Sequence, residues 1–249
     1  MLEYISAKEH TSVAELSRHF DVTEVTIRSD LKALAKTGRV ARTHGGARLV
    51  EDRVRQEFTF QTRKNLNWPV KQKIGGVAAA LVNPTDSILL DSSTTALALA
   101  NALDRRTDLK DVTVIPTGIW TAIALMGSQH IHVLLPAGYL RHTTGSITGL
   151  PSRDFFSGLI IQKAFLGAWG VSYDNGLTDT HLLEIDLKKS IVSKVKEIIV
   201  LVDGSKFHQS GIASYASIDQ ISTIVTDNTA PDEELKRIEQ RGIRVLIGN

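Results

Sequence analysis

Residues 23–47 read TEVTIRSDLKALAKTGRVARTHGGA, and this stretch decides how the amino-terminal part of the chain folds. Apolar residues recur at Ile27, Leu31 and Leu34, so they share one face of a helix, and polar and basic residues share the other face. Thr23 stands where its hydroxyl can cap the first turn. The stretch therefore predicts an amphipathic helix whose polar face is free to meet a partner.

The neighbouring segments complete a larger motif. A supporting helix is expected over residues 2–10, and a second short helix over 12–20, separated by a two-residue link from the helix that Gly38 ends. Residues 39–49 then alternate across a Gly45-Gly46 turn, as a hairpin does. Helix, turn, helix and hairpin together predict a winged helix-turn-helix domain, whose second helix enters the DNA major groove.

Positive charge is concentrated in this motif. Between residues 28 and 48 the chain carries six lysines and arginines against the single acid Asp30. A basic run alone is more often a solvated face than a binding site, but here it lies on the second helix and the wing. The DNA-binding residues that we expect are Thr23, Thr26, Arg28, Lys32, Arg42, His44, Gly45 and Gly46.

A family resemblance accompanies these residues. The pattern T-x-x-T-I-R-x-D-L-x-x-L-x-x-x-G-x-x-x-R-x-H-G-G-A over 23–47 resembles the DeoR family of bacterial transcriptional regulators. The resemblance implies a DNA-binding head and a carboxy-terminal sensor domain, related in fold to ribose-5-phosphate isomerase, that binds a sugar phosphate. Ser29 stands where the family usually has a second arginine, which removes one basic contact to the operator.

Bulk properties exclude several classes of protein. The net charge of +2 over 249 residues is small, so basicity matters only where it is concentrated. The absence of cysteine rules out disulfides and thiolate metal sites and fits a reducing cytoplasm. We expect a cytoplasmic protein without a membrane segment, because no apolar run approaches the roughly 20 residues that a membrane helix needs.

Beyond the winged motif the sequence period changes. From residue 87 onward, short apolar runs alternate with helical stretches, which is typical of a Rossmann-like open α/β sheet. We therefore expect a winged helix-turn-helix domain over 1–50, a linker over 51–69, and an α/β effector-binding and oligomerisation domain over 70–249. The expected strands are 88–91, 112–115, 131–135, 164–167, 198–203, 221–226 and 243–247, and the expected helices 94–103, 118–126, 153–159, 183–195 and 232–240.

Ligands of such sheets bind beyond the carboxyl ends of the strands, where the strand order reverses. The first strand runs into Asp91-Ser92-Ser93-Thr94-Thr95, where small hydroxyls and a helix N-terminus can hold a phosphate. The same residues equally describe a capped helix without a ligand. The family pattern here is D-x-G-T-T, so Ser93 replaces a glycine.

Other strand ends carry similar residues. Arg141 could bind an anion or lie on the surface, and Lys206 could neutralise a phosphate or pair with Asp203. Asp179, His181 and Glu184 could hold sugar hydroxyls. The expected effector-binding residues are Asp91, Ser92, Ser93, Thr94, Thr95, Thr117, Gly118, Gly138, Tyr139, Arg141, Glu184 and Lys206.

These features support one main hypothesis and one alternative. The main hypothesis is a DNA-binding repressor of a carbohydrate-catabolism operon, a dimer or tetramer whose operator binding a phosphorylated sugar modulates. The alternative is a sugar-phosphate isomerase with an appended DNA-binding head, in which Glu184 or Asp91 acts as base beside Lys206. We favour sensing, because such a head is unusual on a metabolic enzyme. We expect no metal or other cofactor.

Overall fold

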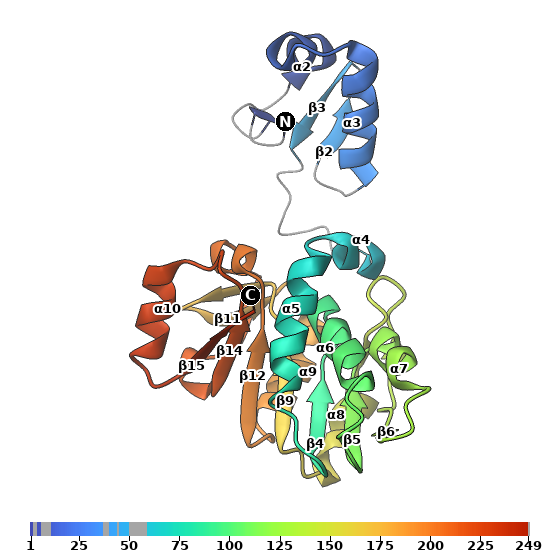
Figure 1. Cartoon of the computed structure of the whole chain (residues 1–249), viewed down its shortest axis with the longest axis vertical. Helices are drawn as coiled ribbons and strands as arrows, with labels where there is room; N and C mark the ends of the chain where they lie inside the picture. The colour runs from blue at the N-terminus through green and yellow to red at the C-terminus, as the bar shows by residue number, and fades with distance from the viewer. Residues whose placement is uncertain (2–3, 6–10, 37–39, 44, 50–58, 249) are drawn as a thin grey trace. The chain divides into compact units, whose positions relative to one another are not determined.

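The computed structural model describes residues 1, 4–5, 11–36, 40–43, 45–49 and 59–248. The chain divides into two compact units, Met1–Thr62 and Arg63–Asn249, called here the head and the body (Figure 1). Several predictions lie outside the described residues: the supporting helix apart from residues 4–5, Gly38, His44 and the first part of the predicted linker, residues 51–58.

The head contains the two predicted helices. Helix α2 (Val13–Phe20) begins after Ser12, whose hydroxyl accepts a hydrogen bond from the Glu15 amide at 3.1 Å. Helix α3 (Glu24–Lys36) begins after Thr23, whose hydroxyl accepts one from the Thr26 amide at 3.2 Å. The expected apolar face of α3 is buried. The head core consists of Ile5, Val13, Leu16, Ile27, Leu31, Val40 and Ala47, with Leu34 packed against it.

The wing is a small antiparallel sheet. Strands β2 (Val40–Thr43) and β3 (Gly46–Leu49) form the predicted hairpin, and Gly45 in its turn has φ +87°, a conformation that favours glycine. Strand β1 (Thr11–Ser12), which we did not predict, pairs with the other side of β3. The wing is therefore attached to the start of α2 as well as to the end of α3.

One helix lies within the second half of the range predicted as a linker, over 51–69, and another begins at its end. Helix α4 (Phe60–Asn65) is followed by a left-handed Asn67 and by α5 (Trp68–Ala79). Pro69 lies in the first turn of α5, where its missing N–H breaks no helical hydrogen bond. The Trp68-Pro69 pair thus starts a helix.

All seven predicted strands form one parallel sheet in the order β15-β14-β12-β9-β4-β5-β6. The chain builds outward from β4 in one direction and from β9 in the other, so the strand order reverses between these two strands. The strands are β4 (Ser87–Leu90), β5 (Val112–Pro116), β6 (Ile131–Val133), β9 (Lys163–Leu166), β12 (Glu197–Leu201), β14 (Thr223–Thr226) and β15 (Arg244–Ile247).

Helices cover both faces of this sheet (Figure 1). One apolar core lies between the sheet and α5, α6 and α7, and another lies between the sheet and α9 and α10. This is the doubly wound arrangement that the alternating sequence predicts. The helix bounds are α6 (Thr94–Asp104), α7 (Ile119–Leu125), α8 (Leu150–Phe155), α9 (Leu182–Val192) and α10 (Asp232–Glu239), with short 3-10 helices η1 (Phe156–Gly158), η2 (Gly204–His208) and η3 (Ile218–Gln220).

Five short strands of the body were missed. Strands β7 (Tyr139–Leu140) and β8 (Ile147–Thr148) form a hairpin, and β10 (Gly170–Ser172), β11 (Gly176–Asp179) and β13 (Ala213–Ala216) form a second antiparallel sheet. These strands have two to four residues and lack the longer aliphatic runs that mark the parallel strands, so the sequence pattern did not reveal them.

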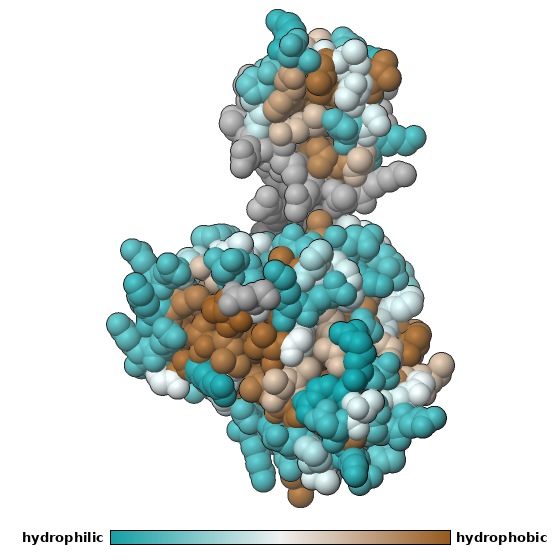
Figure 2. All heavy atoms as spheres, in the orientation of Figure 1, coloured by the Kyte–Doolittle hydropathy of each residue, from teal (hydrophilic) through white to brown (hydrophobic). Residues whose placement is uncertain are grey.

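The visible face of the body is largely hydrophilic, with an apolar area between α5 and α10 (Figure 2). Val245, Leu246 and Ile247 of the end strand β15 are only partly buried at this end of the sheet. Among the described residues, none of the helices has the length and apolar character to span a membrane.

Gly75→Ala is expected to destabilise the body by about 1–3 kcal/mol, because overpacking separates α5 from α6. A Cβ at Gly75 would lie 2.6 Å from the backbone of Ala98 and Leu99, whereas one at Gly76 would meet nothing within 4 Å. Gly76→Ala is the matched control and should be neutral or stabilising by up to about 1 kcal/mol. Urea unfolding followed by tryptophan fluorescence measures both, since Trp68, Trp120 and Trp169 all belong to the body. Equal stabilities would contradict the close packing.

Candidate DNA-binding face and effector site

The polar face of α3 is open to solvent. Thr26, Arg28 and Lys32 are exposed, whereas Ile27 and Leu31 on the opposite face are buried. The Arg28 guanidinium pairs with Glu24, one turn earlier, at 2.7 Å and stays 56% exposed. This pair is weak because it is solvated, so a guanine or a phosphate can replace Glu24 at little cost.

The wing residues divide into exposed and structural ones. Gly45 is exposed in the turn, and its carbonyl accepts a hydrogen bond from the Val13 amide at 2.9 Å. Gly46 is buried and pairs with both Ser12 and Thr43, so it holds the wing in place. Arg42 lies in β2, but its side chain and all of His44 are outside the described residues.

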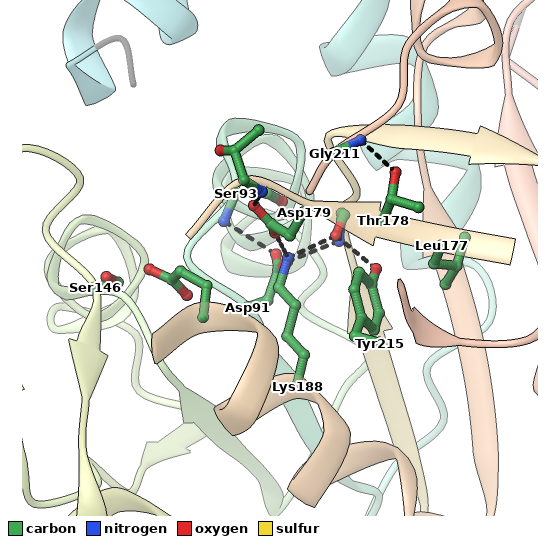
Figure 3. Close-up of polar contacts among 12 residues, drawn as sticks. Asp91, Ser93, Ser146, Leu177, Thr178, Asp179, Lys188, Gly211 and Tyr215 are labelled. Carbon is green, nitrogen blue, oxygen red and sulfur yellow. Dashed lines mark hydrogen bonds and ion pairs between the residues drawn. The ribbon is translucent and has the colours of Figure 1, made fainter. Parts of the chain in front are cut away.

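The main polar feature of the body is a buried ammonium group, that of Lys188 on α9. It lies 3.1 Å from an Asp91 carboxylate oxygen and 2.9 Å from an Asp179 oxygen (Figure 3). It also donates to the Gly167 carbonyl at 2.7 Å, which accepts a second hydrogen bond from the Tyr215 hydroxyl at 2.8 Å. The lysine therefore connects α9 to the ends of β4, β9 and β11.

The charges in this cluster stabilise one another. Burial alone would lower the Lys188 pKa, but Asp179 and Asp91 raise it well above its usual value. Burial would raise the Asp179 pKa, but the nearby Lys188 holds it below its usual value. Burial also raises the pKa of Tyr215, whose ring lies 4.9 Å from the Lys188 ammonium. At neutral pH the ammonium and the Asp179 carboxylate are charged, and Tyr215 is a neutral donor.

Asp91 lies where the strand order reverses. One carboxylate oxygen accepts a hydrogen bond from the Ser93 amide at 3.0 Å, and the other accepts one from the Gly167 amide at 2.8 Å. The Ser93 hydroxyl accepts from the Ala96 amide at 3.0 Å, so Ser93 is the N-cap of α6. The side chain of Ser93 therefore caps α6, as in the capped-helix alternative that the sequence left open. Ser92, Thr94 and Thr95 are buried beside it.

Two glycines make room for this loop. A Cβ at Gly167 would lie 2.6 Å from the Ser93 Cβ, and one at Gly118 would lie 2.8 Å from the Ser92 Cα. Ser93 can replace the family glycine because position 167 has no side chain. Thr117, before Gly118, is buried and donates its amide to the Leu90 carbonyl at 2.9 Å.

Arg141 and Glu184 form a second buried pair. Their side chains are 12% and 7% exposed and meet at 2.9 Å, so Arg141 is not a surface arginine. Gly138 packs against Ser152, whose hydroxyl oxygen would lie 2.2 Å from a Cβ at position 138. Tyr139 is 74% exposed, and the structure does not bring it into the cluster around Lys188.

Two lysines lie in the loops and helices that adjoin the ends of β9 and β12. The Lys206 ammonium, in η2, lies 5.4 Å from the centre of the Trp169 ring, and burial lowers its pKa despite Asp203. Lys71 on α5 is 5% exposed, and burial lowers its pKa to about 8. Asp203 opposes that shift, whereas Lys206 and Arg63 add to it.

Lys71, Lys188 and Tyr215 were not among the predicted site residues. Lys188 had a signal, since it follows Glu184 by one helical turn on the face of α9 that also carries the buried Ile191. His181, considered as a sugar ligand, is the N-cap of α9, and its Nδ1 accepts from the Leu183 amide at 3.3 Å.

The arrangement favours binding over proton transfer. Asp91 is held by Lys188 and two amides, and Glu184 is paired with Arg141. Both carboxylates are already engaged by partners within the fold, which disfavours either residue as the base of an isomerase. Within the described ranges, no group of three or more His, Cys, Asp or Glu residues is placed to hold a metal ion.

Comparison with known proteins identifies the chain. The family model described as the DeoR C terminal sensor domain matches residues 67–228, and the DeoR-like helix-turn-helix domain matches residues 1–53. The chain belongs to the DeoR family. It is a transcriptional regulator and not an enzyme. The family that the pattern over residues 23–47 predicted is confirmed.

Similar regulators span almost the whole chain. The HTH-type transcriptional regulator GolR of Listeria innocua is 32% identical, over 99% of this chain and 96% of its own. IolR of Bacillus subtilis is 30% identical and the glycerol-3-phosphate regulon repressor of Escherichia coli 29%, both with the same coverage. Among solved structures, ribose 5-phosphate isomerase A of Methanocaldococcus jannaschii is 23% identical with a TM-score of 0.42, covering 57% of this chain and 55% of its own.

Lys188→Met is expected to destabilise the body of this DeoR-family regulator by about 3–5 kcal/mol, because Asp91 and Asp179 would stay buried without their counter-ion. Lys189→Met is the matched control, since Lys189 is the next residue on the same helix and is exposed. Urea unfolding monitored by tryptophan fluorescence gives both values. Similar losses in the two variants would show that the buried pair does not stabilise the fold.

Proposed function

We propose that the chain represses a carbohydrate-catabolism operon in the bacterial cytoplasm and that a phosphorylated sugar modulates its operator binding. The observation that carries the proposal is the exposed basic face of α3 on a buried head core, in a chain whose family matches include both a DNA-binding and a sensor domain. The names of relatives support the class of regulon, since they include a glycerol-3-phosphate regulon repressor and a putative aga operon repressor.

In this proposal α3 enters the major groove. Thr26, Arg28 and Lys32 contact base edges or phosphates from its exposed face. The remaining residues, Thr23, Arg42, His44, Gly45 and Gly46, place the start of α3 and the wing. Phosphate contacts supply much of the affinity and make it fall with salt, whereas the few base contacts decide the sequence.

The effector would bind at the carboxyl ends of β4, β9 and β12. Arg141 and Lys206 supply positive charge there, and the N-terminus of α6 at Ser93 to Thr95 supplies a helix dipole. Asp91, Ser92, Thr117, Gly118, Gly138, Tyr139 and Glu184 complete the predicted set. A ligand that binds one head arrangement better than another by about 1–3 kcal/mol would change operator occupancy several-fold to a hundredfold.

The regulator would also self-associate, since a symmetric operator needs two heads. Apolar side chains are exposed near the open edge of the sheet at β6: Trp120, Ile123, Met126, Leu134, Leu135, Tyr139 and Leu140. A second copy of the chain is the partner that fits, because self-pairing of this surface covers the edge and brings two heads to one operator.

Arg28→Ala should weaken binding to the chain's own promoter DNA by about 1–3 kcal/mol if Arg28 reads a guanine. Fluorescence anisotropy at low ionic strength measures the affinity, with Arg105→Ala as the control, because Arg105 is an exposed arginine of the body. Addition of a panel of sugar phosphates then tests modulation. If the wild type does not bind the promoter, or if no sugar phosphate changes its affinity, the proposal is wrong.

Met126→Glu should weaken self-association by about tenfold or more, since it places a charge in the apolar surface beside β6. Ile160→Glu is the matched control, because Ile160 is similarly exposed, at 77% against 80%, and lies outside α7, β6 and β7. Sedimentation equilibrium gives the dissociation constants. Equal effects of the two variants would assign the interface to another surface.

A further inference from the structure

Lys71, a buried lysine of α5, binds the segment that precedes this helix. Its ammonium donates to the carbonyls of Arg63 and Leu66, both at 2.6 Å. Arg63 belongs to the last turn of α4, and Leu66 lies in the turn between α4 and α5. The carbonyls at a helix end have no partner within the helix, so the ammonium stabilises the end of α4.

The same ammonium lies in an electrostatic cluster with the effector site. Lys71 interacts with Asp203 and Lys206, and Arg63 interacts with Lys71, Lys206 and Asp179. Asp179 is also paired with Lys188, and Asp203 interacts with both Lys71 and Lys206. Burial lowers the pKa of both lysines, so additional negative charge beside them would be stabilising.

The Lys71 ammonium can donate one more hydrogen bond. An ammonium has three donors, and two of those of Lys71 go to the α4 and turn carbonyls. No further hydrogen bond of this ammonium is found among the residues that the structure describes. An anion on the third donor would keep Lys71 charged and would strengthen its bonds to both carbonyls.

We propose that Lys71, together with Lys206, binds the anionic group of the effector and that Lys71 transmits this binding to α4. Ligand binding then orders α4, the first described helix after the head core. This inference rests on the proposed sugar-phosphate function and adds to it the residue that links the ligand to α4.

The test compares Lys71→Met with Lys73→Met in the full-length protein. Lys73 lies on the same helix and is exposed, so it controls for loss of charge on α5. Inorganic phosphate and the sugar phosphates of the panel are titrated by calorimetry. Lys71→Met should bind them about tenfold or more weakly, because a charge-assisted hydrogen bond is lost, whereas Lys73→Met should match the wild type.

Hydrogen exchange reports the coupling. In the wild type, ligand should slow exchange of the amides over residues 60–66 several-fold, and in Lys71→Met the same amides should exchange faster and not respond to ligand. Lys71→Arg, which keeps the charge, should retain part of both effects, and it replaces Lys71→Met if tryptophan fluorescence shows that the latter does not fold.

The outcomes separate the two proposals. If a sugar phosphate changes promoter binding of the wild type while Lys71→Met keeps both its ligand affinity and the exchange response, the role of Lys71 is wrong and the proposed function stands. If the wild type binds phosphate compounds but the exchange of residues 60–66 does not change, the coupling is wrong. If the wild type binds no phosphate compound, both proposals fail.

Discussion

The ion pairs and hydrogen bonds of the buried Lys188 ammonium hold together the strand ends at which the effector is proposed to bind. It is shared by Asp91 after β4, Asp179 at the end of β11 and the Gly167 carbonyl after β9. A charge removed from water is tolerated only when its partners are in place, so these segments must assemble together with α9. The geometry at the reversal of strand order is therefore set by the core of the body and not by its surface loops.

The sequence predicted the regular parts of this fold well, for a physical reason. Parallel strands are buried on both faces, so they appear as continuous apolar runs, and all seven were located to within a few residues. The amphipathic α3 was equally clear because Ile27 and Leu31 repeat with the helical period. The short strands β10, β11 and β13 were not predicted, because their sequences GVS, GLTD and ASYA contain no continuous apolar run.

The sequence selected the segments of the candidate site but did not reveal the partners of their side chains. The rule that ligands bind at strand ends selected Asp91 and Arg141, but it could not reveal that Arg141 pairs with a glutamate 43 residues away. Lys71 and Lys188 were missed because a lysine in a helix is usually solvated, and only tertiary packing shows that these two are buried. The role of a side chain that pairs with a residue distant in the sequence becomes visible only in the three-dimensional structure.

The fit between Ser93 and Gly167 also constrains how this loop can have evolved. Any side chain at position 167 would overlap Ser93, so serine at 93 is compatible only with glycine at 167. A change from glycine to serine at 93 is therefore possible only in a chain that already has glycine at 167. The two positions are thus epistatic, and the order of their replacements was not free.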